Sequence, residues 1–225
     1  MTDTIELLVL RLEGLLQSWG EHSKWDRRDS ADLPTRSGII GLLGCALGLP
    51  RNDPEMIELN RAVAIGVRAD RSGSRTVDYQ TVTAENGLMT ASGKKRSLGN
   101  TIVSEREYLE DACFTVFIEP DPEWRERLIK ALNDPRWPVY LGRKNCVPSR
   151  PVYVGYDDRY TSIKDAIRRY PRADRSDTVI AYEIEQDDPT LSSHTRPDDP
   201  IGPNRRFDER LTWRGILKED CDVSV

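Results

Sequence analysis

The chain has 225 residues and a formal net charge of −5, which excludes a uniformly basic nucleic-acid-binding protein. Recurrent apolar runs, five Trp and eight Tyr exclude an intrinsically disordered chain. No stretch approaches the roughly 20 apolar residues of a membrane span, and the first residues lack the uninterrupted apolar core of a signal peptide. We therefore expect a cytoplasmic protein of one domain, or of one domain with a small appendage.

The charge is unevenly distributed. Residues 176–225 hold 12 acids and 6 bases, whereas residues 1–175 hold 26 acids and 27 bases. Within that near-neutral part, residues 142–175 carry 9 bases against 4 acids, and residues 91–106 carry 4 bases against 1 acid. The average thus conceals basic patches, and an RNA partner is not expected along the acidic C-terminal segment.

Motifs for metal, cofactor or hydrolytic chemistry are absent from the sequence. The four cysteines form no CxxC pair and lie far apart: Cys45, Cys113, Cys146 and Cys221. The only histidines are His22 and His194, so a closed zinc site has no support. The sequence also lacks GxSxG, HExxH and P-loop motifs. We expect no metal and no cofactor.

The N-terminal part predicts a strand, a loop and a glycine-rich helix. Apolar residues alternate over 5–11, and an irregular loop follows at 15–35. Thr35 or Ser37 is a candidate N-cap for the apolar run that follows. This helix contains four glycines: Gly38, Gly41, Gly44 and Gly48. Because each glycine costs a helix interior about 1 kcal/mol, we expect another backbone, from protein or ligand, to approach closely here.

The remaining elements follow a strand and helix order. They are a short helix at 54–61, strands at 63–67 and 75–82, a loop at 84–104, a strand at 113–118, a helix from Pro122, strands at 151–157 and 178–185 around a short helix at 162–170, an acidic loop at 186–203, and a strand pair around 206–218. The strands at 63–67 and 75–82 are expected to pair as a hairpin. The order up to the Pro122 helix is close to βαββαβ, the ferredoxin-like (RRM-like) arrangement of an α+β protein.

Three basic clusters are candidates for contact with RNA. They are Lys24, Trp25, Arg27 and Arg28, with Arg36 at the start of the glycine-rich helix; Lys94, Lys95 and Arg96, with Arg106 further on; and Arg143, Lys144 and Asn145 after Gly142. A helix N-terminus favours phosphate, and a glycine permits close approach of a backbone. Each cluster alone is typical of a solvated loop. Together, beside aromatic residues, they indicate an RNA-binding surface.

Catalytic alternatives are few. His22 lies in a polar loop, where it is a candidate acid–base group for RNA cleavage, although a lone loop histidine is more often simply solvated. The pairs at 157–158 and 187–188 are adjacent acids of the kind usually found on solvated surfaces, and the sequence places no third metal ligand beside them.

Six ordered motifs resemble one family. They are LQSWG at 16–20, PTRSGIIGLLG at 34–44, DYQTV at 78–82, REYL at 106–109, DACFTV at 111–116 and YLGRKNC at 140–146. In order and spacing they resemble the CasD family of the type I-E CRISPR Cascade complex, among the repeat-associated mysterious proteins. The similarity runs from about residue 5 to about residue 155.

This resemblance implies a fold, a function and partners. The fold is a ferredoxin-like domain over 1–147, with a thumb inserted at about 83–106, followed by a small β-rich subdomain over 148–225. The function is non-catalytic binding of the 5′ handle of the guide RNA, through Arg36, Arg106, Arg143 and Lys144. The partners are the backbone and large subunits of Cascade; contact with target DNA is left open.

Two other functions remain open at this stage. The related type I-C subunit is a processing endoribonuclease, so metal-independent cleavage by His22 or a Tyr–Lys pair is one alternative. A protein–protein scaffold that binds no RNA is the other.

Overall fold

The computed structural model describes residues 4–24, 26–83, 93, 101–185, 190, 193–202 and 206–218. The strands are β1 (Ile5–Glu13), β2 (Leu16–Gln17), β3 (Arg27–Arg28), β4 (Val63–Arg71), β5 (Ser74–Thr83), β6 (Thr101–Glu110), β7 (Cys113–Pro120), β8 (Tyr153–Tyr160), β9 (Val179–Glu185), β10 (His194–Gly202) and β11 (Arg206–Lys218). The helices are α1 (Arg36–Leu47), α2 (Glu55–Arg61), α3 (Pro122–Asn133) and α4 (Ile163–Arg169). None of these helices is long and apolar enough to cross a membrane.

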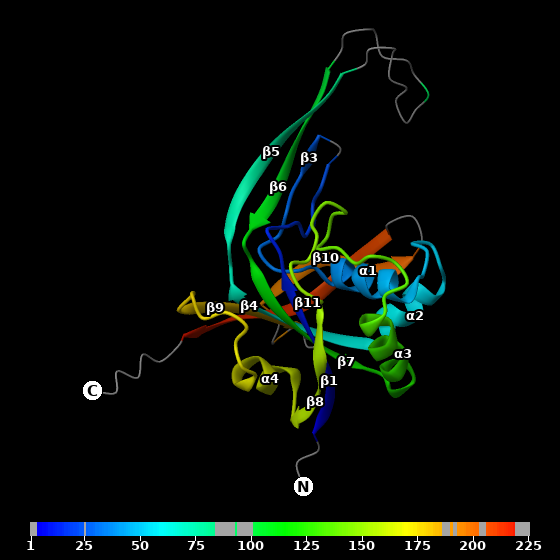
Figure 1. The fold of residues 1–225 in the computed structure, drawn as a ribbon, viewed down its shortest axis with the longest axis vertical. Coiled ribbons are helices and arrows are strands. Elements are labelled where there is room, and N and C mark those ends of the chain that lie inside the picture. Colours follow the sequence, from blue (N-terminus) through cyan, green and yellow to red (C-terminus); the bar gives the residue numbers. More distant parts are fainter. Residues whose placement is uncertain are drawn as a thin grey trace, which may run out of the picture.

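The predicted ferredoxin-like arrangement is confirmed. A seven-stranded sheet has the order β10-β11-β9-β4-β7-β1-β8, in which the four strands β4-β7-β1-β8 are joined by antiparallel pairs (Figure 1). Helix α1 lies between β1 and β4 in the chain, and α3 lies between β7 and β8, which gives the βαββαβ order. The fourth strand of this unit, β8, comes after residue 147, so the boundary expected there falls within one sheet.

The two faces of this sheet carry different helices. Alternate residues of β1 point to opposite sides, as the strand period requires. Leu8, Leu10 and Leu12 belong to the core cluster that includes buried residues of α1 and α3. Leu7 and Val9 belong to a second cluster, which contains buried residues of α4. Both faces of the central sheet are therefore covered, by α1 and α3 on one side and by α4 on the other.

Helix α1 is defined by its caps and by tight contacts at two glycines. The hydroxyl of Thr35 accepts a 3.2 Å hydrogen bond from the backbone N–H of Gly38 at the N-terminus, and Gly48 ends the helix with a φ of 77°. A Cβ on Gly38 would lie 2.8 Å from the Trp19 ring, and one on Gly44 would overlap Met56. Close packing by protein side chains thus explains two of the four glycines.

The hairpin predicted between the strands at 63–67 and 75–82 is wrong. Strand β4 pairs with β7 and β9, whereas β5 pairs with β6 over its whole length, from Ser74↔Glu110 to Thr83↔Thr101. Between β4 and β5, Gly73 has a φ of 72°, and a Cβ there would overlap the Glu110 carbonyl oxygen. The chain therefore passes into a second sheet at this turn. The β5–β6 hairpin, here called the thumb hairpin, projects far from the body (Figure 1).

The loop predicted at 186–203 is wrong over its second half, which forms β10. This strand lies at the edge of the large sheet and pairs only with β11. Pro197 and Pro200 are tolerated because an edge strand leaves one side unpaired, and the register shifts between Arg196 and Asp199 and between Pro200 and Gly202. The predicted strand pair at 206–218 is a single strand, β11, that pairs with both β10 and β9.

Candidate functional site

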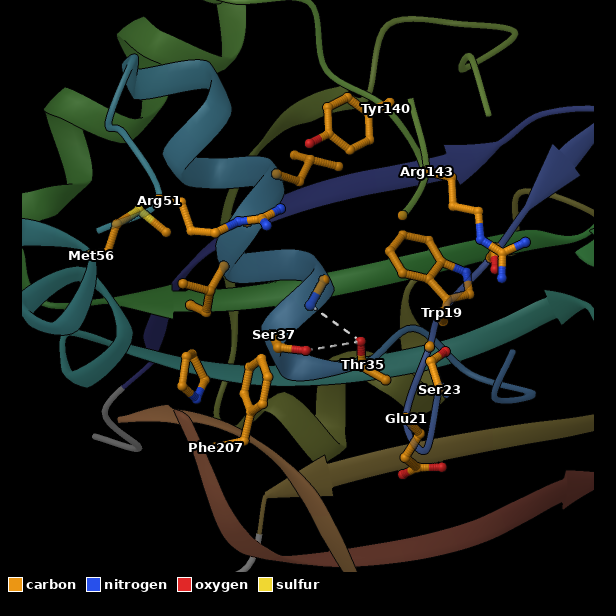
Figure 2. Close-up of a pocket in the computed structure, with 18 of the residues that line it drawn as sticks. Trp19, Glu21, Ser23, Thr35, Ser37, Arg51, Met56, Tyr140, Arg143 and Phe207 are labelled. Atoms are coloured by element: carbon orange, nitrogen blue, oxygen red, sulfur yellow. Dashed lines mark hydrogen bonds between the residues drawn. The ribbon is translucent and has the colours of Figure 1, made fainter. Parts of the chain in front are cut away.

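A cleft of about 740 Å³ opens on the α1 side of the central sheet. It lies between the segment Trp19–Ser23, helix α1, the loop at 51–57 and the end of the β10–β11 hairpin (Figure 2). Three cationic side chains line it: Arg28, Arg51 and Arg143. Two aromatic rings, those of Tyr140 and the 45% exposed Phe207, also line it. The cleft therefore combines positive charge with flat apolar surface, the pairing that single-stranded nucleic acid requires.

The floor of the cleft is built by the LQSWG segment. Trp19 is 1% exposed, and its indole N–H donates a 3.2 Å hydrogen bond to Oε1 of Gln17. The Gln17 amide in turn donates to the carbonyl oxygens of Leu12 (3.1 Å) and Ala112 (2.7 Å). This motif has a structural role, because it fixes the indole ring against α1.

Arg143 is held in place from one side. Its guanidinium donates to the carbonyl oxygens of Glu107 (3.1 Å) and Arg28 (3.0 Å) and lies 4.6 Å from the centroid of the Tyr108 ring. These partners bring no negative charge, so the guanidinium keeps its positive charge at the cleft. Asn145 supports the arrangement through a 3.1 Å hydrogen bond from its amide to the Tyr108 hydroxyl.

Gly142 explains why the 140–146 loop reaches the cleft floor. Its φ is 88°, and a Cβ there would overlap the carbonyl oxygen of Ser18. The backbone that approaches this glycine is thus the protein's own, where the sequence suggested a phosphate or ribose. The close approach lets Ser18 N–H donate a 3.1 Å hydrogen bond to the Leu141 carbonyl oxygen.

Arg28 and Arg106 lie side by side. They are directly paired in register where β3 runs parallel to β6. Nε of Arg106 is buried and has no hydrogen-bond partner among the described residues. Neither side chain forms an ion pair with a carboxylate in the described part of the chain. A buried, unsatisfied guanidinium N–H is costly, so this pair of cations favours an anionic ligand.

Arg27, by contrast, is neutralised. Its guanidinium lies 3.0 Å from Oε1 of Glu107, which is 8% exposed and also pairs with Arg75 at 2.7 Å. Burial by itself raises the pKa of Glu107, but the hydrogen bonds from Arg27 and from the Ser30 N–H, with the charge of Arg75, hold it below its ordinary value. Arg27 therefore organises the strand β3 and brings little free charge to the surface.

Arg36 is buried among acids. It is 7% exposed, forms an ion pair with Glu185, and donates from Nε to Oδ1 of Asn60 (2.9 Å). Desolvation lowers its pKa to about 10, so it stays charged at neutral pH. The backbone N–H of Arg36, at the N-terminus of α1, donates to Oδ2 of Asp198 (2.8 Å). The position expected for a phosphate is thus taken by a carboxylate of the protein.

The other predicted contacts are placed as follows. Lys24 and Lys144 are exposed and form no ion pair in the described residues. Trp25, Lys94 and Lys95 lie outside the described residues. The sequence did not single out Arg51, Tyr140 or Phe207; of these only Tyr140 had a signal, as the first residue of the YLGRKNC motif.

His22 lines the cleft and is exposed, and its backbone N–H donates to Oδ2 of Asp29 (2.7 Å). Within the described part of the chain, no hydrogen bond joins its ring to another side chain. The described residues also contain no group of three or more His, Cys, Asp or Glu side chains that could hold a metal ion.

Comparison with known proteins gives a consistent answer. The sequence model of a family of CRISPR-associated proteins (Cas5) matches residues 7–212. The CRISPR system Cascade subunit CasD of Escherichia coli (strain K12) is 36% identical over 156 residues, which are 66% of this chain and 70% of the relative.

Solved structures agree. A chain from a CRISPR RNA-guided surveillance complex superposes with a TM-score of 0.75 at 30% identity, covering 94% of this chain and 90% of that one. A crystal structure of a Cas protein gives a TM-score of 0.71 at 32% identity, covering 94% and 95%. The resemblance inferred from the six motifs is confirmed: the chain belongs to the Cas5 family of CRISPR-associated proteins, together with CasD.

Proposed function

We propose that this chain is a non-catalytic subunit of a Cascade surveillance complex and that its cleft binds the 5′ handle of the guide RNA. The observation that carries the proposal is the pair Arg28 and Arg106, adjacent in register and without a carboxylate partner among the described residues. Arg143 lies beside them, with its charge unneutralised. Three guanidinium groups in one place match the phosphate spacing of a nucleic-acid strand better than a surface that only needs solubility.

Each part of the cleft has a role in this proposal. Arg28 and Arg106 bind phosphates of the handle, and Arg143 fixes the strand where it enters the cleft. Arg51 contacts the strand from the opposite rim. Tyr140 and Phe207 offer surfaces on which unpaired bases stack, and such stacking is worth about 1–3 kcal/mol per base.

Gly41 supplies a further argument. It is exposed, lines the cleft, and a Cβ there would meet nothing within 4 Å. Packing within the protein therefore does not explain a glycine at this place in a helix. Close passage of a ribose–phosphate backbone over α1 explains it, because a side chain would keep the strand away.

The predicted RNA contacts do not enter the proposal equally. Lys24 and Lys144 remain proposed contacts at the rim, and Trp25, Lys94 and Lys95 remain predictions from the sequence. Arg27 and Arg36 are not proposed as contacts, since acids of the chain neutralise them. Asn145 is proposed to act through Tyr108 and Arg143.

Assembly with other subunits is proposed to use the thumb hairpin. Val77, Tyr79 and Val103 share one of its faces and are 53%, 65% and 39% exposed. An apolar stripe on a projecting hairpin is costly in water and is typical of a surface that another protein covers. We propose the backbone subunit as that protein, with the large subunit bound elsewhere on the chain.

The proposal is tested with a double variant, Arg28→Ala with Arg106→Ala. We expect the affinity for handle RNA at fixed salt to fall at least tenfold, because two phosphate contacts are lost. The matched control is Arg61→Ala with Lys130→Ala, which removes two exposed cations far from β3 and β6 and should leave the affinity unchanged. Equal affinity for the double variant and the control would overturn the assignment of the site.

The endoribonuclease alternative makes a separate prediction, because His22 lines the same cleft. Pure protein is incubated with repeat RNA in EDTA, with His22→Ala alongside. Under our proposal both proteins bind the RNA and neither cuts it. Cutting at the handle boundary by the unsubstituted chain, lost in His22→Ala, would make the protein an enzyme.

A further inference from the structure

A second groove, of about 310 Å³, lies at the C-terminal end of α4, beside β9 and the end of β11. Every charged side chain that lines it is a cation: Arg68, Arg168, Arg169, Arg172, Arg175 and Lys218. Helix α4 packs on the face of the central sheet opposite to α1. This groove, here called the basic groove, therefore lies on the other side of the sheet from the cleft.

Part of this charge serves the fold. Arg68 is 1% exposed, pairs with Asp70 at 2.6 Å, and donates to the carbonyl oxygens of Ile167 and Tyr170, both at 2.8 Å. It ties the end of α4 to β4. Arg169 pairs with Asp165 at 2.9 Å, one helical turn earlier. These two cations are balanced by acids of the chain.

Other cations in the groove are not balanced. Arg168, Arg175 and Lys218 are exposed and form no ion pair with any described residue. The last turn of a helix favours a cation, which accounts for Arg168. That argument does not reach Arg175, which follows the helix in a separate segment, or Lys218 at the end of β11. Their convergence on one groove raises the local positive potential, which favours an anion.

The shape of the ligand follows from what the groove lacks. The residues that line it include no Asn, Gln, Ser or Thr, the side chains that read base edges besides arginine. Its one aromatic residue, Tyr170, packs edge-to-face on Phe117 with 5.5 Å between ring centroids. An unpaired base therefore finds no free ring on which to stack.

We propose that the basic groove binds the phosphodiester backbone of double-stranded DNA, independently of its sequence. The four arginines at 168–175 account for nearly half of the nine bases in the 142–175 segment, and the cleft uses only its first residues. Because the two sites lie on opposite faces of the sheet, the duplex is a ligand distinct from the strand in the cleft. This inference stands independently of the handle-binding proposal.

The test uses the full chain and a fluorescent DNA duplex of about 20 base pairs and mixed sequence, with anisotropy measured over a range of salt concentrations. The variant is Arg168→Ala with Arg175→Ala. We expect the slope of log K against log salt to become shallower by about two, and the affinity at 0.1 M salt to fall roughly 50-fold. The control, Arg61→Ala with Lys130→Ala, should match the unsubstituted chain.

Four outcomes decide the matter. An unchanged slope and affinity in the variant overturns the proposal. So does loss of affinity for a polyglutamate peptide while duplex binding is unchanged, since the groove would then serve an acidic protein. An equal loss for single-stranded polyuridine overturns the assignment to a double helix. Arg28→Ala with Arg106→Ala should keep the duplex slope while losing handle RNA; if it instead abolishes the slope, the duplex binds in the cleft.

Discussion

The backbone N–H of Arg36 donates a 2.8 Å hydrogen bond to Oδ2 of Asp198, which lies 162 residues later in the chain. The same carboxylate accepts hydrogen bonds from Arg210 at 3.0 and 3.1 Å. Arg36 opens helix α1, and Asp198 belongs to β10. The acidity of the C-terminal segment thus has an internal use: it fixes the β10–β11 hairpin on the helix that lines the cleft.

The first prediction concerns this carboxylate. Asp198→Asn should lower the free energy of unfolding by about 3 kcal/mol, because it leaves buried arginines without their counter-charge. Urea denaturation followed by circular dichroism measures the change. Asp208→Asn is the matched control: Asp208 is exposed on β11 and accepts only from the N–H of Glu209, so its loss should be within about 0.5 kcal/mol. Equal losses in the two variants would contradict the prediction.

The second prediction is the pH dependence of the same contact. Burial by itself raises the pKa of Asp198, but the hydrogen bond from Arg210 and the charges of Arg210 and Arg196 hold it below its ordinary value. A carboxyl group whose folded pKa is depressed stabilises the fold above its unfolded pKa of about 3.9 and loses this contribution as the pH falls further. The stability difference between the unsubstituted chain and Asp198→Asn should therefore shrink below about pH 4. A difference that stays constant through this range would show that Asp198 acts without its charge.

The third prediction separates stability from binding at Gly41. Gly41→Ala should stabilise the chain by up to about 1 kcal/mol, because alanine favours a helix interior and the new methyl group meets nothing within 4 Å. The same methyl group should weaken handle binding, since the RNA backbone is proposed to pass there. In Gly38→Ala the Cβ would lie 2.8 Å from the Trp19 ring, so this control should lose stability. Unaltered RNA affinity in Gly41→Ala would remove the close approach from the proposal.

The fourth prediction concerns the thumb hairpin. Tyr79→Ser should leave the stability of the isolated chain within about 0.5 kcal/mol, because the side chain is 65% exposed, and should reduce co-purification with the other subunits. Val82→Ser is the control, since Val82 is 52% exposed on the opposite face of the hairpin. If the control reduces co-purification as much as Tyr79→Ser, the stripe of Val77, Tyr79 and Val103 is not the docking face.

Local signals predicted the elements that local chemistry determines. The alternation in β1, the N-cap at Thr35 and the proline at the start of α3 are each contained in a few neighbouring residues. Strand β10 escaped detection because Pro197 and Pro200 are typical of loops, and only its position at a sheet edge makes them tolerable. The pairing of β5 with β6 was missed because the short link after β4 looks like a hairpin turn.

The candidate site shows the same limit. Sequence reasoning found the basic residues but could not tell the neutralised arginines from the free ones. Arg27 and Arg36 meet Glu107 and Glu185, which lie 80 and 149 residues away in the chain. Arg28 and Arg106 were predicted on the same grounds and have no such partner among the described residues. Only the tertiary structure separates these two classes.

The thumb hairpin also has a mechanical consequence. Its two legs continue from neighbouring strands of the central sheet: β5 begins two residues after β4 ends, and β7 begins soon after β6 ends. At the base, Arg71 donates to the carbonyl oxygen of Asp111, and Gly73 packs against Glu110. The legs therefore cannot pivot independently. A subunit that pulls on the tip loads both middle strands of the sheet at once, so the thumb acts as a stiff lever whose displacement reaches the floor of the cleft.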